Sequence, residues 1–189
     1  MDCYKRSSAK YLPYYEQMLS RHSCVTTVRA AEICAEFDTA SLDAVVLSGS
    51  QVMLSEESPG EQLVAFCRRL KIPTLGICFG HQLLAYSFGA IVRQGTLQDG
   101  DETILIDEPW PFLRDLAPRA VMRESHREFV PRESVQSIGW QVGAHSASCP
   151  TEAIKHPTLP LYGVQFHPER SGRPGELLFA AFFRELVRI

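Results

Sequence analysis

The stretch Gly76-Ile77-Cys78-Phe79-Gly80-His81-Gln82 decides the fold, because it connects a short apolar run to a helical pattern through a cysteine between two glycines. The run Thr74-Leu75-Gly76-Ile77 predicts a buried strand, and the apolar residues that follow predict a helix that ends at Phe88 with Gly89 as its cap. The two glycines let the chain turn sharply from strand to helix without Cβ clashes. The sequence therefore predicts a strand–turn–helix unit with Cys78 at the turn.

Cys78 has the position of a nucleophile at such a turn. A strand-to-helix elbow exposes the side chain at its apex, and the free N–H groups at the start of the helix stabilise a thiolate. The other cysteines lack these surroundings and show no C-x-x-C spacing, so we expect reduced and mostly buried structural thiols at Cys3, Cys24, Cys34, Cys67 and Cys149.

A thiolate nucleophile needs a base, and the base needs a group that orients it. The segment Tyr162-Gly163-Val164-Gln165-Phe166-His167-Pro168-Glu169 supplies both, because His167 and Glu169 end a strand-like run two residues apart. Residues i and i+2 of an extended chain project to the same side, so Glu169 can hold the imidazole of His167 in one tautomer. The sequence predicts a Cys–His–Glu triad in that chain order.

The segments around these motifs alternate between strand and helix patterns. Asp43-Ala44-Val45-Val46-Leu47 predicts another buried strand, and Ser58-Pro59-Gly60-Glu61 has the pattern of a capping box that starts a helix. Further helices are expected over residues 9–20, 30–37, near 110–116 and over 175–187, and further strands over 24–28, 104–106, 120–123, 136–142, 152–155 and 162–166. We expect an α/β fold in a single domain of residues 1–189: an open, mostly parallel sheet flanked by helices, with an antiparallel insertion in the second half.

Composition and charge exclude several classes of protein. The 189 residues are 45% hydrophobic and 22% charged, which fits a globular chain with a buried core rather than a disordered one. The net charge of -3 gives no basic surface for nucleic acid, and no apolar run is long enough for a membrane span or a signal peptide. We therefore expect a cytoplasmic protein without a nucleic-acid or membrane partner.

The two motifs at 76–82 and 162–169 together resemble the signatures of class I glutamine amidotransferase domains, and the GMP-synthetase type is the most similar. The resemblance covers nearly the whole chain and implies that family's flavodoxin-like α/β fold. It also implies hydrolysis of L-glutamine to glutamate and ammonia through a γ-glutamyl thioester, with a synthase subunit in trans that receives the ammonia. No cofactor is implied, and because no cluster with the spacing of metal ligands is visible, no metal is expected.

The resemblance assigns catalytic roles to matching residues. Cys78 matches the nucleophile, His167 the base and Glu169 the residue that orients it. The N–H of Phe79 matches one donor of the oxyanion hole, and the loop Ser48-Gly49-Ser50 matches the other. The family usually has Gly-Gly-Pro in this loop, so the serine after the glycine departs from the pattern.

Other matches concern the substrate. Gln82 matches a residue that contacts bound glutamine. Ser125-His126-Arg127-Glu128 resembles a Ser-His-x-Asp stretch of the GMP-synthetase branch, whose backbone binds the α-amino and carboxylate groups of glutamine. A polar loop is an equal alternative for the histidine and glutamate of this stretch. His81 is assigned to helix packing, because the family's base is the distant histidine.

Two other functions stay open. The triad would act equally on the γ-carbonyl of a γ-glutamyl peptide, so a stand-alone γ-glutamyl hydrolase or peptidase is one alternative. A catalytically weak regulatory or pseudoenzyme subunit is another, because Ser50 departs from the family pattern and Met1-Asp2-Cys3-Tyr4 leaves almost none of the family's first strand.

Overall fold

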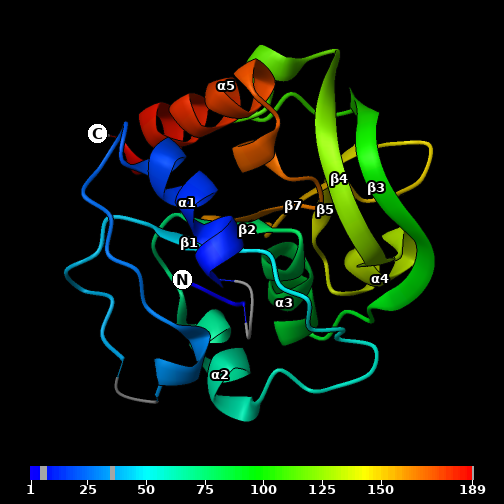
Figure 1. Ribbon diagram of the computed structural model, residues 1–189. Helices are drawn as coiled ribbons and strands as arrows, with labels where there is room; N and C mark the ends of the chain where they lie inside the picture. Colours follow the sequence, from blue (N-terminus) through cyan, green and yellow to red (C-terminus); the bar gives the residue numbers. More distant parts are fainter. Residues whose placement is uncertain (5–7, 35–36, 189) are drawn as a thin grey trace.

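The computed structural model describes residues 1–4, 8–34 and 37–188, and Figure 1 shows the path of the chain. The described strands form one seven-stranded sheet in the order β1-β2-β7-β6-β5-β3-β4. Its parallel part consists of β1 (Val45–Leu47), β2 (Thr74–Ile77) and β7 (Leu161–Val164), with β2 in the middle. Because β2 and β7 are parallel neighbours, the two predicted motifs follow them at the same edge of the sheet.

The remaining strands pair antiparallel and come from the second half of the chain. β6 (Ala153–Lys155) and β5 (Gln141–His145) extend the sheet beyond β7. β3 (Arg93–Ile106) and β4 (Arg119–Phe129) form a hairpin at its far edge, green in Figure 1, and both are longer than the short strands expected there. The predicted α/β fold with an antiparallel insertion is confirmed, and its parallel part is smaller than we expected.

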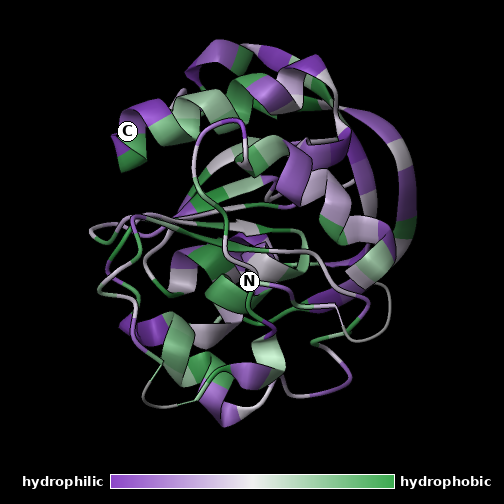
Figure 2. Ribbon diagram, turned by 60° about the vertical axis from the view of Figure 1, so that its left-hand side comes forward, coloured by the Kyte–Doolittle hydropathy of each residue, from purple (hydrophilic) through white to green (hydrophobic). Residues whose placement is uncertain are grey.

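Helices cover both faces of the parallel strands. α1 (Ser8–Leu19) and α5 (Arg173–Phe182) lie on one face, and α2 (Glu61–Arg69) and α3 (Phe79–Ser87) lie on the other (Figure 1). A π-helical turn, Phe183–Val187, continues α5. Each face has its own hydrophobic core, and Figure 2 shows hydrophobic residues concentrated toward the centre of the molecule. None of the described helices is long and apolar enough to cross a membrane.

The first residues of the chain lie beside β1, where a further strand would pair. The carbonyl oxygen of Met1 accepts the N–H of Ser48 at 3.1 Å, and on its other side Asp2 forms a parallel bridge with Arg29. The strand predicted over residues 24–28 is wrong. This segment forms no ladder, and its pairing within the described chain is limited to the bridge at Asp2, so its apolar residues lack a full partner strand.

Three other predicted boundaries differ from the structure. The helix after the expected capping box begins only at Glu61, because Gly60 turns the chain at φ 91° and the preceding serine hydroxyl accepts the Gly60 N–H. Residues 136–142 do not form one strand, because α4 (Arg132–Ser137) occupies the first of them and β5 follows. The helix expected over 30–37 is a 3₁₀ turn, Ala30–Glu32, and residues 35–36 lie outside the described chain.

Candidate active site

Cys78 lies at the turn between β2 and α3, as the sequence predicts. Its backbone has φ 51° and ψ -104°, a conformation that is costly for any residue with a Cβ atom. The flanking glycines permit this turn: a Cβ atom on Gly76 would lie 2.4 Å from the Gly80 carbonyl oxygen, and one on Gly80 would lie 2.4 Å from that of Leu47. The elbow therefore places the Cys78 thiol at the N-terminus of α3, where helical N–H groups lack intrahelical partners.

His167 and Glu169 follow β7 and form a buried pair. Glu169 lies in a 3₁₀ turn, Pro168–Arg170, and its Oε1 is 2.7 Å from Nδ1 of His167. Burial by itself lowers the pKa of His167, but the charges of Glu169 and Cys78 outweigh it and hold this pKa well above 6.5. Within the described chain, Nε2 of His167 has no hydrogen-bond partner, so it is the nitrogen available to exchange a proton with the thiol.

The sulfur of Cys78 contacts two further groups. The thiol lies 3.8 Å from the Ser125 carbonyl oxygen on β4, and the Gln165 side chain donates to the sulfur from Nε2 at 3.6 Å. The amide oxygen of Gln165 accepts a hydrogen bond from Gln82 at 3.1 Å, and Gln82 also donates to the Glu128 carbonyl at 2.8 Å. Sequence reasoning missed Gln165. The available signal was its place two residues before the catalytic histidine, on the same side of an extended run.

The loop after β1 reaches the triad. A Cβ atom on Gly49 would lie 3.1 Å from Cε1 of His167, so the loop contacts the imidazole directly. The N–H of Gly49 donates to the Tyr15 hydroxyl of α1 at 2.9 Å. Ser50 does not have a positive φ, so a serine at this position adds no backbone strain. Phe79, the other predicted donor, is the first residue of α3.

β4 contains the predicted substrate-binding stretch, and its side chains alternate between two sides. His126 and Glu128 face inward and are buried, whereas Ser125 is half-buried and Arg127 is exposed. The Glu128 carboxylate accepts the backbone N–H groups of residues 54–55 at 2.8 Å each. Glu128 therefore fixes the segment between β1 and α2, and the part of β4 nearest the thiol is the Ser125 carbonyl.

A thiol beside a buried imidazole–carboxylate pair can attack a carboxamide carbon and return a proton to the leaving nitrogen. The family model for glutamine amidotransferase class-I matches residues 2–186 of this chain. The chain belongs to the class I glutamine amidotransferase family. The resemblance seen in the two sequence motifs is confirmed, and so is the class of enzyme.

This amidotransferase is similar to glutamine-hydrolysing subunits of GMP synthase. It is 38% identical over 147 residues to the subunit from Ignicoccus hospitalis, a match that covers 77% of each chain. It is 32% identical over 171 residues to the one from Methanothermobacter thermautotrophicus, which covers 86% of this chain and 90% of the relative. The crystal structure of a candidate GMP synthase subunit from Thermoplasma acidophilum has the same fold, with a TM-score of 0.79 at 24% identity over 96% of this chain and 92% of that one.

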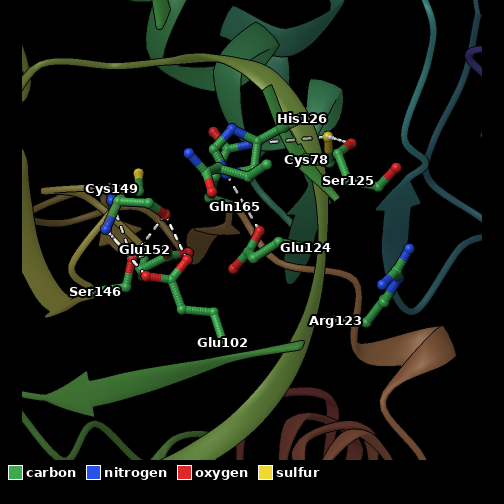
Figure 3. A network of polar contacts seen from close by, with 12 residues as sticks. Cys78, Glu102, Arg123, Glu124, Ser125, His126, Ser146, Cys149, Glu152 and Gln165 are labelled. Carbon is green, nitrogen blue, oxygen red and sulfur yellow. Dashed lines mark hydrogen bonds and ion pairs between the residues drawn. The ribbon is translucent and has the colours of Figure 1, made fainter. Parts of the chain in front are cut away.

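Three buried side chains that sequence reasoning did not connect meet near the triad of the amidotransferase. Glu124 and His126 come from β4, and Glu152 directly precedes β6 (Figure 3). Burial raises the pKa of Glu124 to about 8 and raises that of Glu152 well above its usual value. His81, which was assigned to packing, is fully buried against Gly163, and burial lowers its pKa to about 3.

Proposed function

We propose that the chain acts as one domain over residues 1–189, hydrolyses L-glutamine and passes the ammonia to a synthase subunit of the GMP synthase type. The observation that carries this proposal is the Cys78 elbow beside the His167–Glu169 pair, with 2.7 Å between Nδ1 and Oε1. Similarity to proteins named as glutamine-hydrolysing GMP synthase subunits supports a second subunit in trans. The six free thiols suit a reducing compartment, and we place the reaction in the cytoplasm.

The reaction follows from the protonation of the pair. Because the pKa of His167 is raised by its neighbours, the imidazole keeps a proton and Cys78 acts as the thiolate. The sulfur attacks the γ-carboxamide carbon of glutamine, and His167 protonates the leaving nitrogen, which departs as ammonia and leaves a γ-glutamyl thioester. His167 then takes a proton from water, whose oxygen attacks the thioester and releases glutamate and the thiolate. Glu169 holds the ring in one orientation throughout.

The tetrahedral intermediates carry a negative oxygen that requires N–H donors. We assign the N–H of Phe79 as one donor, because it heads α3 directly after the nucleophile. We assign the loop at Gly49 and Ser50 as the other, because it contacts the ring of His167.

The rest of the substrate is assigned to β4. The backbone of Ser125, His126 and Arg127 would bind the α-amino and carboxylate groups of glutamine, since the Ser125 carbonyl already contacts the nucleophile. Gln82 acts through Gln165 instead of touching the substrate, because its amide nitrogen donates to two groups inside the protein.

One observation favours a partner-dependent enzyme over a stand-alone γ-glutamyl hydrolase. The N–H of Gly49 donates to Tyr15 at 2.9 Å, so this donor can serve an oxyanion only after the loop or α1 has moved. A synthase subunit that shifts the loop would complete the site. The buried triad geometry argues against the other alternative, a catalytically silent subunit.

Glutamate release from L-glutamine tests the proposal. The purified chain is assayed alone and with a GMP synthase-type ATP-pyrophosphatase subunit, and Cys78→Ala is the control. We expect slow release by the chain alone, a large increase with the second subunit, and none with Cys78→Ala, which should still bind glutamine. Release that survives the substitution contradicts the nucleophile. Full activity without a partner favours the stand-alone hydrolase, and no activity with either favours the silent subunit.

A further inference from the structure

A second cluster of reactive side chains lies beside the triad, and these side chains have no part in the proposed hydrolysis. Glu124 and His126 point inward from β4, and Glu152 reaches them from the residue before β6 (Figure 3). Their exposed fractions are 1%, 7% and 0%. Across residues 1–4, 8–34 and 37–188, this is the one group of three carboxylate, imidazole or thiol side chains whose ligand atoms all lie within 4.8 Å of one another.

Hydrogen bonds around the cluster direct its lone pairs toward one another. Nδ1 of His126 lies 2.9 Å from the Glu128 carbonyl oxygen, so Nδ1 carries the proton of the neutral ring and Nε2 presents a lone pair. This Nε2 is 3.3 Å from Oε2 of Glu124. Oε1 of Glu152 accepts a hydrogen bond from Ser146 at 2.7 Å, but in the described chain its Oε2 and both oxygens of Glu124 have no hydrogen-bond partner. Several acceptors thus face one another in a dry interior.

No protein cation balances these acceptors in the part of the chain that the structure describes. Glu124 and Glu152 form no ion pair with a lysine or an arginine there. Arg123 is next in sequence, but it pairs with Asp99 and points away from the cluster in Figure 3. Buried carboxylates without a counterion are strongly destabilising, so protons or a bound cation must lie between them.

We propose that Glu124, His126 and Glu152 form a binding site for a divalent transition-metal ion such as Zn²⁺. One imidazole nitrogen and two carboxylates are ligands that such ions accept, with coordination positions left for water. The backbone carbonyl that fixes the ring of His126 and the hydroxyl that fixes Glu152 are the outer hydrogen bonds typical of metal ligands. Bonds of ~2.1 Å separate two ligands of one ion by at most about 4.2 Å, so small side-chain rotations close the site.

The backbone of the same residues touches the triad. The Arg123 carbonyl accepts the N–H of His167 at 2.8 Å, the Ser125 carbonyl contacts Cys78, and the Glu152 carbonyl accepts the N–H of Gln165 at 2.9 Å. An ion that draws β4 toward residue 152 would therefore shift groups in contact with the nucleophile and the base. The ion would act as a regulator of glutamine hydrolysis, although binding itself does not depend on that function.

Zinc binding is measured by calorimetry and by metal analysis after dialysis. The experiment uses Cys78→Ser protein, so that the reactive thiol does not compete for the ion. We expect one equivalent of Zn²⁺, and affinity weaker by roughly a hundredfold or more after Glu124→Gln and Glu152→Gln are added. Glu128→Gln is the matched control, because this buried carboxylate on the same strand binds residues 54–55 instead of the cluster and its loss should leave zinc binding unchanged.

Two further readouts keep the test decisive if the added substitutions disturb folding. Zn²⁺ should raise the melting temperature of the Cys78→Ser protein itself, because an ion that binds only the folded state stabilises it. Co²⁺ in the same protein should give no sulfur-to-metal charge-transfer band. The proposal is overturned if the Cys78→Ser protein binds no zinc, or if a thiolate band assigns the ion to a cysteine such as Cys149. It is also overturned if folded Glu124→Gln and Glu152→Gln protein binds zinc equally well.

Discussion

Replacing Glu169 with glutamine preserves the shape of the side chain and removes its charge from the buried pair with His167. Burial lowers the pKa of His167, and the charges of Glu169 and Cys78 together raise it well above 6.5. A buried hydrogen bond to a charged group contributes about 1.5–3 kcal/mol and one pKa unit corresponds to ~1.36 kcal/mol, so we expect Glu169→Gln to lower the pKa of His167 by about 1–2 units. The basic limb of the pH–rate profile should move to lower pH by the same amount.

The pKa is followed by NMR titration of the His167 ring, and glutamate release is measured over the same pH range with the synthase subunit present. Asp107→Asn is the matched control, because Asp107 also pairs with a histidine, Nδ1 of His145 at 2.9 Å, but both side chains are 36% exposed. This control should leave the titration of His167 unchanged. A pKa of His167 in Glu169→Gln within about 0.3 units of the parent value would refute the reasoning that the Glu169 charge sets it.

Three other outcomes follow from the same geometry. Gly76→Ala places a Cβ atom 2.4 Å from a backbone oxygen, so its unfolding free energy should drop by about 3 kcal/mol or more in urea denaturation, whereas Gly100→Ala, with 4.0 Å to the nearest atom, should stay within about 1 kcal/mol of the parent. Equal stability of these two variants would contradict the steric account of the elbow. Tyr15→Phe frees the N–H of Gly49 from a bond of ~1 kcal/mol, so glutamate release without a partner should rise about fivefold; an unchanged or slower rate argues against gating by this hydroxyl. Because the folded pKa of His167 exceeds its unfolded value of 6.5, the stability it contributes is complete below about pH 6.5 and is lost as the pH rises through the folded pKa, and denaturation curves that do not change over this range would count against the raised pKa.

The elbow and the triad could be predicted from sequence because their determinants are local. Glycines two residues on either side of Cys78 have one evident steric purpose, and the structure places their backbones in contact with neighbouring chain. His167 and Glu169 are also two residues apart, so a short segment determines their pairing. The alternation of strands and helices was equally visible, since it depends on runs of apolar residues.

Features that depend on distant segments could not be predicted in the same way. The apolar run at 24–28 looks like a strand, but a strand requires a partner ladder, and within the described chain only Asp2 pairs beside it. The meeting of Tyr15 with Gly49, or of Glu152 with Glu124, follows from how helices and strands pack, and no spacing in the sequence encodes it. The unpartnered carboxylates of the cluster became apparent only when burial was known.

The backbone at Cys78 makes the sulfur a trait that folding opposes. At φ 51° and ψ -104°, a residue with a Cβ atom is destabilised by about 1–3 kcal/mol, whereas glycine adopts such angles for an entropic cost of ~0.5–1 kcal/mol. A descendant that no longer needed to hydrolyse glutamine would therefore fold more stably after exchanging this cysteine for glycine. The amino acid at position 78 thus records the history of selection: cysteine is retained there for as long as turnover benefits the organism.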